Sequence, residues 1–142
     1  MYLDQFEAGQ VFGIEPVNIT KELITSFANV YDPNKFHLDE EFSKTTRYGN
    51  IIAPGVMCFM LTWAQFIRQN VFGDEMIAGK STKIEWHHPV FADDVLTSKA
   101  TVVEVAPRNQ YNGIITVRFD AYNQNGVHVL TDVTETVLKR TD

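Results

Sequence analysis

The sequence predicts an α+β domain in which a curved antiparallel sheet is wrapped around one long apolar helix. Residues 51–67 contain no charged side chain, as expected for a helix that is surrounded by protein. The second half of the chain is rich in Val, Ile, Thr and aromatic residues with much alternation, which is typical of strands. With 142 residues, of which 44% are hydrophobic, the chain has the size and composition of a single domain, residues 1–142.

The first elements along the chain are a strand and two short helices. We expect the strand near residues 11–18. Thr20 is a favourable N-cap, and apolar residues follow it at helical spacing over 21–31. This helix ends before Pro33, because the residue that precedes a proline is disfavoured in the α region. Asp39 predicts the cap of one further helical turn.

The apolar helix comes next. Pro54 suits its first turn, and the pattern continues to about Asn70. Between 56 and 67 apolar residues occur on every side of the helix, which predicts burial all round.

Four further segments are predicted strands. Their ranges are 81–88, 95–105, 113–123 and 127–138, and Asn125-Gly126 is a hairpin signal between the last two. Since hairpins join strands that are neighbours in sequence, we expect a four-stranded antiparallel meander rolled around the helix. Such a sheet leaves open edges, so a homodimer that pairs edge strands is expected.

Composition narrows the class of function. The chain has 12 Lys+Arg against 18 Asp+Glu, a formal charge of −6, which argues against nucleic acid and anionic membranes as partners. The first residues carry acids and no apolar run, so a signal peptide is not expected and a cytoplasmic location is. Cys58 is the single cysteine and is interpreted as a core residue. His87 and His88, adjacent in a predicted strand, point to opposite faces, so no metal site is expected.

A candidate site lies in the loop at 31–42, which holds Asp32, Asn34 and His37. A turn at Pro33 can bring the carboxylate and the imidazole to one water molecule, where the two groups form an acid/base pair. The alternative is that the segment is a type I turn with a surface histidine.

Four segments resemble those of a known family. They are FEAGQVF near the start, FANVYDPNKFHLDEEFSKTTRYGNIIAPGVM at 27–57, IEWHHPVFADDVL at 84–96 and AYNQNGVHVL at 121–130. Over nearly its whole length the chain resembles the MaoC-like (R)-specific enoyl-CoA hydratases and dehydratases. The resemblance implies a hot-dog fold and a role in fatty acid metabolism. The implied reaction is reversible hydration of trans-2-enoyl thioesters to (R)-3-hydroxyacyl products. It also implies no cofactor, because coenzyme A or an acyl carrier is part of the substrate.

The resemblance assigns roles to residues of this chain. It implies a catalytic dyad of Asp32 and His37, with the backbone N–H of Gly55 holding the thioester oxygen at the start of the apolar helix. Asn34 matches the motif and either orients the dyad or is only a turn residue. Two further sets of residues have two readings each. The aromatic and sulfur side chains of the helix either pack in the core or line the acyl pocket, namely Met57, Phe59 and Trp63. The basic residues near the loop either are solvated or contact coenzyme A phosphates, namely Lys35, Lys44 and Arg47.

Two departures from the family pattern are present. Lys35 stands where the motif has proline, which predicts a looser loop around His37, and Pro54 stands where the family often has Ser or His. The dehydratases that carry a glutamate on the central helix are poorly matched, because Met60 occupies that place. A domain that binds acyl thioesters without catalysis and an acyl-CoA thioesterase are the alternative functions, since one fold hosts many functions.

Overall fold

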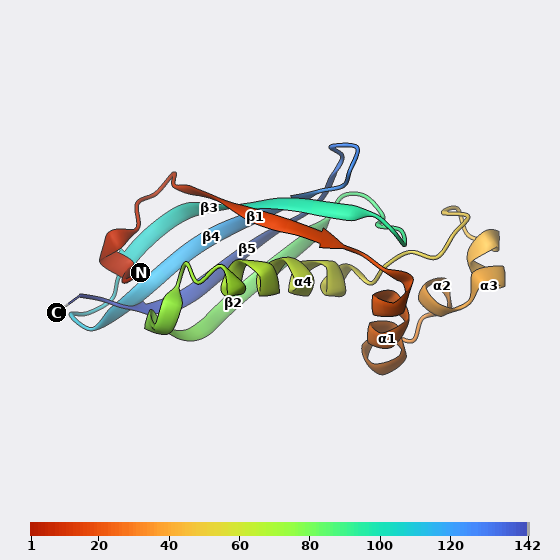
Figure 1. Cartoon of the computed structure of the whole chain (residues 1–142). Coiled ribbons are helices and arrows are strands. Elements are labelled where there is room, and N and C mark those ends of the chain that lie inside the picture. Colours follow the sequence, from red (N-terminus) through yellow and green to blue (C-terminus); the bar gives the residue numbers. More distant parts are fainter. Residues whose placement is uncertain (142) are drawn as a thin grey trace.

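The computed structural model describes residues 1–141, which form one five-stranded antiparallel sheet and several helices (Figure 1). The strands are β1 (Val11–Asn18), β2 (Met76–Trp86), β3 (Val95–Pro107), β4 (Asn112–Tyr122) and β5 (His128–Lys139). The helices are α1 (Lys21–Tyr31), α2 (Lys35–Leu38), α3 (Glu40–Thr45) and α4 (Gly55–Arg68), with 3-10 turns at Leu3–Gln5 and Gly73–Glu75.

The predicted elements of the first half are confirmed, and their caps form as expected. The Thr20 hydroxyl accepts a hydrogen bond from the Leu23 N–H at 3.2 Å, at the start of α1. Asp39 Oδ1 accepts one from the Phe42 N–H at 3.0 Å, at the start of α3. In Figure 1 the short helices α1, α2 and α3 gather beyond one end of the sheet, away from the N-terminus at the other end.

The prediction of a four-stranded meander is wrong in one respect. The strand order is β1-β3-β4-β5-β2, so β2 pairs with β5 and forms one edge, while β1 forms the other. Only β3, β4 and β5 are consecutive neighbours, and the connection between β2 and β3 crosses two strands. The alternation within a strand shows which face is buried but not which strand lies beside it, so sequence neighbours were the wrong guide here.

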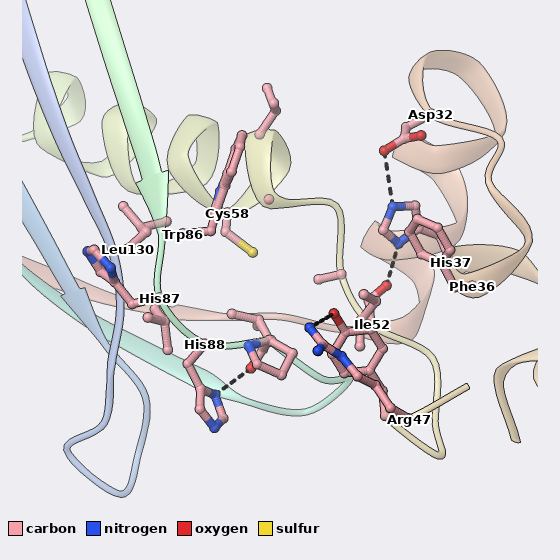
Figure 2. Close-up of a pocket in the computed structure, with 17 residues that line it drawn as sticks. Asp32, Phe36, His37, Arg47, Ile52, Cys58, Trp86, His87, His88 and Leu130 are labelled. Atoms are coloured by element: carbon pink, nitrogen blue, oxygen red, sulfur yellow. Dashed lines mark hydrogen bonds and ion pairs between the residues drawn. The ribbon is translucent and has the colours of Figure 1, made fainter. Parts of the chain in front are cut away.

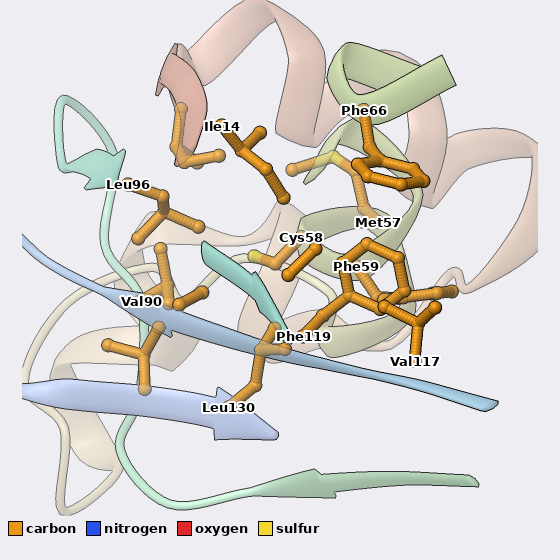
Figure 3. Packing of buried hydrophobic residues seen from close by; sticks show 14 of the residues in the cluster. Ile14, Met57, Cys58, Phe59, Phe66, Val90, Leu96, Val117, Phe119 and Leu130 are labelled. Carbon is orange, nitrogen blue, oxygen red and sulfur yellow. The ribbon is translucent and has the colours of Figure 1, made fainter. Parts of the chain in front are cut away.

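The helix α4 lies along the inner face of the sheet and supplies much of the core (Figures 1 and 3). Its side chains Phe59 and Phe66 stack edge-on against Phe119 of β4, with ring centroids 5.9 and 5.2 Å apart. Burial all round is wrong for the single chain, since Val56 and Met60 are each 46% exposed. The physical reason is that the sheet covers only one side of α4. Within residues 1–141, no helix combines the length and the apolar character that crossing a membrane requires.

Candidate active site

A cavity of about 460 Å³ opens at the end of the sheet where the short helices meet the start of α4 (Figure 2). Four separate parts of the chain line it. They are the α1–α2 junction, residues 47–58, the end of β2 with the loop that follows, and the start of β5. The cavity therefore joins the predicted catalytic loop to the N-terminus of the apolar helix.

Asp32 and His37 meet at this cavity, as the spacing of the loop predicted. His37 Nε2 lies 3.0 Å from Asp32 Oδ2, and His37 Nδ1 lies 2.6 Å from the carbonyl oxygen of Ile52 (Figure 2). The imidazole is 4% exposed, whereas the Asp32 side chain is 36% exposed. The ring is thus fixed at both nitrogens and sheltered, while the carboxylate remains open to the cavity.

The hydrogen bonds determine where protons lie in this pair. A backbone carbonyl only accepts, so His37 Nδ1 carries a hydrogen and donates it to Ile52. His37 Nε2 can then donate to Asp32 Oδ2 or accept from it across the contact of 3.0 Å. An imidazole and a carboxyl group in direct contact at a cavity wall can pass a proton between them, which is what general acid/base catalysis requires.

Local sequence places both groups. The helix α1 ends at Tyr31, and the Asp32 N–H caps it by donating to the Ala28 carbonyl. The short helix α2 then begins at Lys35 and carries the imidazole. The looser loop predicted from Lys35 is not seen, because this residue starts a helical turn that the Ile52 N–H anchors by donating to the Phe36 carbonyl at 3.2 Å.

The side chain of Asn34 contacts the dyad. Its Nδ2 donates to Asp32 Oδ1, the oxygen that does not face His37. It makes no side-chain cap for α2, although it occupies the N-cap position. The side-chain amide of Asn34 therefore hydrogen-bonds the Asp32 carboxylate and does not cap α2.

The N-terminus of α4 faces the same cavity through Gly55 and Val56. Pro54 supplies no side-chain cap, and its carbonyl accepts a hydrogen bond from the Cys58 N–H at 3.2 Å. The first N–H groups of a helix have no partner within it and lie at its positive end. The space beside Gly55 is not empty, since a methyl group built there would lie 2.2 Å from Nε1 of Trp86.

Only one of the three basic residues expected at the phosphates lines the cavity, and it is Arg47. Lys44 forms an exposed ion pair with Glu41 at 3.0 Å, one turn away on α3. The Lys35 ammonium lies over the Phe42 ring, 5.6 Å from its centroid. Neither lysine lines the cavity, so a contact of either with coenzyme A phosphates stays a prediction.

The residues considered for the acyl pocket differ in what they line. Met57 is 2% exposed and lines neither of the two cavities described here, so its part in an acyl pocket stays a prediction. Phe59 and Trp63 line a second cavity, of about 430 Å³, farther along α4. Phe59 is itself a core residue, 5% exposed, so one side chain packs in the core and also forms part of the cavity wall.

Sequence reasoning missed the contribution of Trp86, His87 and His88, which line the first cavity. The two histidines were expected on opposite faces of a strand, but β2 ends at Trp86 and both residues form part of the cavity wall. His87 Nε2 bonds the Thr131 hydroxyl at 3.0 Å, and His88 Nδ1 lies 2.8 Å from the Pro89 carbonyl. Within the described chain, no three His, Cys, Asp or Glu side chains are grouped as a metal site requires.

Cys58 also reaches the cavity wall but behaves as a core residue. It is 2% exposed, and burial raises the pKa of its thiol to about 12. A thiol with that pKa carries almost no thiolate near neutral pH and is a poor nucleophile. Its interpretation as a structural cysteine is consistent with this burial.

Comparisons with known proteins agree with the fold. Residues 7–132 match the family described as FAS1-like, dehydratase domain region. The chain is 33% identical over 141 residues to the uncharacterized protein YdeM of Bacillus subtilis, covering 99% of this chain and 100% of the relative. A MaoC-like dehydratase from Rhodospirillum rubrum superposes with a TM-score of 0.91 at 26% identity, covering 100% and 99% of the two chains. An Archaeoglobus protein called a monoamine oxidase regulatory protein gives a TM-score of 0.93 at 26% identity, covering 100% and 96%.

Proposed function

Because the chain belongs to the FAS1-like dehydratase-region family, with the hot-dog fold of the MaoC-like dehydratases and hence a hydratase/dehydratase function, we propose that it hydrates trans-2-enoyl thioesters to (R)-3-hydroxyacyl products and catalyses the reverse dehydration. The observation that carries this proposal is the contact of 3.0 Å between Asp32 and His37 at the wall of a cavity. No group beyond the substrate and water is needed for the reaction.

In the proposed reaction, Asp32 accepts a proton from water and His37 donates a proton to the substrate. The oxygen of a water molecule bonds to the β-carbon while Asp32 takes one of its protons. The electrons of the carbon–carbon double bond move toward the thioester oxygen, and His37 Nε2 delivers a proton to the α-carbon. Proton exchange across the 3.0 Å contact then restores the pair. Asn34, bonded to Asp32 Oδ1, holds the carboxylate in the orientation that this transfer needs.

The thioester oxygen is proposed to bind at the start of α4. Negative charge builds on this oxygen as water attacks, and the N–H of Gly55 lies at the positive end of the helix with no side-chain cap from Pro54. The acyl chain is proposed to extend along α4 toward Phe59 and Trp63 in the second cavity. Arg47 is the basic residue of the cavity wall that suits the phosphates of coenzyme A.

A homodimer is proposed from the free edge of the sheet. β2 is eleven residues long, and its other edge pairs with β5, so its outer edge presents unpaired backbone groups. Large apolar side chains are exposed along β2 and the neighbouring face of α4, namely Ile77 at 50% and Met60 at 46%. Sedimentation equilibrium is expected to give twice the chain mass of 16.2 kDa; a 16.2 kDa species at micromolar concentration would contradict the dimer.

The test of the reaction is loss of ultraviolet absorbance from crotonyl-CoA in the presence of the purified protein. Asp32→Asn and His37→Gln are each expected to lower kcat by roughly 10² to 10⁴, the usual contribution of a general acid or base. Asp74→Asn makes the same chemical change at an exposed residue of the turn Gly73–Glu75 and is expected to leave kcat unchanged.

The alternatives give different results. Release of free thiol from butyryl-CoA, which has no double bond to hydrate, would indicate a thioesterase. Binding of crotonyl-CoA and of longer enoyl-CoA substrates without turnover would indicate a binding module, and full activity in either dyad variant would overturn the mechanism. Chiral chromatography of the 3-hydroxy acid, after removal of coenzyme A, tests the expected (R) configuration.

A further inference from the structure

We propose that Trp86 is a further catalytic residue, whose indole N–H donates a hydrogen bond to the thioester oxygen beside the N–H of Gly55. This inference rests on the proposed function. It concerns a residue at the end of β2, far in sequence from the loop that carries the dyad.

The contact between Trp86 and Gly55 carries the inference. A methyl group built on Gly55 would lie 2.2 Å from Trp86 Nε1 and 2.4 Å from Cε2. The edge of the indole that bears the N–H therefore rests against the first residue of α4, and Figure 2 shows the Trp86 ring beside that first turn. In a helix the Cβ direction tilts toward the N-terminus, so the indole N–H stands at the end of α4 where the free backbone N–H groups are.

The position of Trp86 in the sheet places its side chain on the wall of the first cavity. Trp86 pairs with Leu130 of β5, and both side chains line the first cavity with Asp32 and His37. Trp86 is 52% exposed and is part of the cavity wall, so it is open to a bound ligand. An indole nitrogen can only donate a hydrogen bond, and tryptophan N–H groups in apolar surroundings usually find an acceptor. An enolate-like oxygen bound at Gly55 is such an acceptor.

The same contact gives a physical reason for glycine at position 55. Any side chain there would displace the indole, so the residue that offers its N–H must also leave the neighbouring ring in place. Two donors that converge on one oxygen stabilise its developing charge without reorganisation during the reaction, which is the arrangement of an oxyanion hole.

The kinetic test is Trp86→Phe, which keeps an aromatic ring against Gly55 and removes the N–H. We expect kcat for crotonyl-CoA to fall by roughly 10- to 100-fold, somewhat below the effect of losing a stronger oxyanion donor, with KM changed by less than about threefold. Tyr111→Phe removes a polar hydrogen from an aromatic residue that is 67% exposed in the hairpin between β3 and β4, and kcat should stay unchanged. A kcat within about twofold of wild type in Trp86→Phe would mean that Trp86 only packs, and would overturn the inference.

A second measurement needs no variant of Trp86. The chain has two tryptophans, so a protein labelled with ¹⁵N in the indole gives two N–H signals, which Trp63→Phe assigns. Saturating butyryl-CoA, which cannot be hydrated, is expected to move the Trp86 indole proton downfield through the new hydrogen bond. A bound complex in which this signal does not move contradicts the inference.

The two measurements also separate this inference from the proposed function. Hydration by the wild type together with an unmoved indole signal removes the role of Trp86 alone. A downfield shift without any hydration keeps Trp86 as a thioester donor and removes the proposed reaction. Absence of both binding and hydration overturns both.

Discussion

Two cavities of the molecule are similar in volume, about 460 and 430 Å³, but differ in what lines them. The first is walled by the dyad, by Arg47 and by two histidines. The second lies between α4 and β2 and is lined by Phe59, Met60 and Trp63 together with residues 79–82 and Thr134. Several titratable side chains line the first cavity, whereas Lys80 is the one titratable side chain among the described residues of the second.

In the proposed complex, different turns of α4 contact different parts of the substrate. Gly55 and Phe59 are four residues apart, which is about 6 Å along a helix. The first turn of α4 therefore meets the reacting atoms, and the next turns meet the remainder of the chain. On this reading, changes at the first turn should lower kcat for every substrate, whereas changes farther along should alter the preference among substrates.

Among substitutions that leave the dyad unchanged, Gly55→Ala is expected to disturb the first cavity most. The added methyl group would collide with the indole of Trp86 and displace it. We expect kcat for crotonyl-CoA to fall by at least about 100-fold and the free energy of unfolding to fall by roughly 1 to 3 kcal/mol.

Gly13→Ala is the matched control, because a methyl group on Gly13 in β1 meets no atom within 4 Å. It is expected to retain wild-type kcat. Wild-type kcat in Gly55→Ala would show that neither the helix start nor the Trp86 contact takes part in the reaction.

Asn34→Ala probes the orientation of the carboxylate. Because Asn34 Nδ2 donates to Asp32 Oδ1 and forms no cap for α2, its removal should act on Asp32 and leave the helix in place. A fall in kcat of roughly 10-fold is expected, as for a group that positions the base but exchanges no proton. An unchanged kcat would leave Asn34 as a turn residue.

Met60→Trp sharpens the role of the second cavity. Met60 is 46% exposed and lines that cavity, so a larger ring can fill it without repacking the core. We expect kcat/KM for trans-2-octenoyl-CoA to fall by roughly fivefold relative to crotonyl-CoA, whose short chain does not reach so far. Sedimentation of the variant checks that assembly is unchanged. An equal loss for both substrates would place the acyl chain elsewhere.

The sequence predicted what is local and left open what depends on distant segments. Asp32 and His37 are five residues apart, so a turn and one helical start determine their contact. Trp86 reaches Gly55 from a strand 31 positions away in the chain (86 − 55), and no local pattern encodes that contact. The exposure of α4 and the pairing of β2 with β5 depend likewise on sheet order, which alternation does not specify.

The smallest expected effect concerns the buried carboxylate beside the second cavity. Asp132 is fully buried and accepts hydrogen bonds from the hydroxyls of Thr82 and Thr134. Burial raises the pKa of its carboxyl above the ordinary value of 3.8, although the two hydroxyls oppose that rise. The folded protein therefore binds this proton more tightly than the unfolded chain does. Stability must fall as pH rises above 3.8, until the folded-state carboxyl also ionises.

Asp132→Asn removes this titration and retains the shape of the side chain. Its free energy of unfolding relative to wild type, measured with urea at a series of pH values, is expected to increase as pH rises above 3.8. Because the hydrogen-bond partners of Asp132 within residues 1–141 are threonine hydroxyls and the residue does not line the first cavity, kcat for crotonyl-CoA should stay within about threefold of wild type. A relative stability that is flat with pH would mean that the carboxyl ionises equally in both states. A large loss of kcat would mean that the two cavities share one proton network.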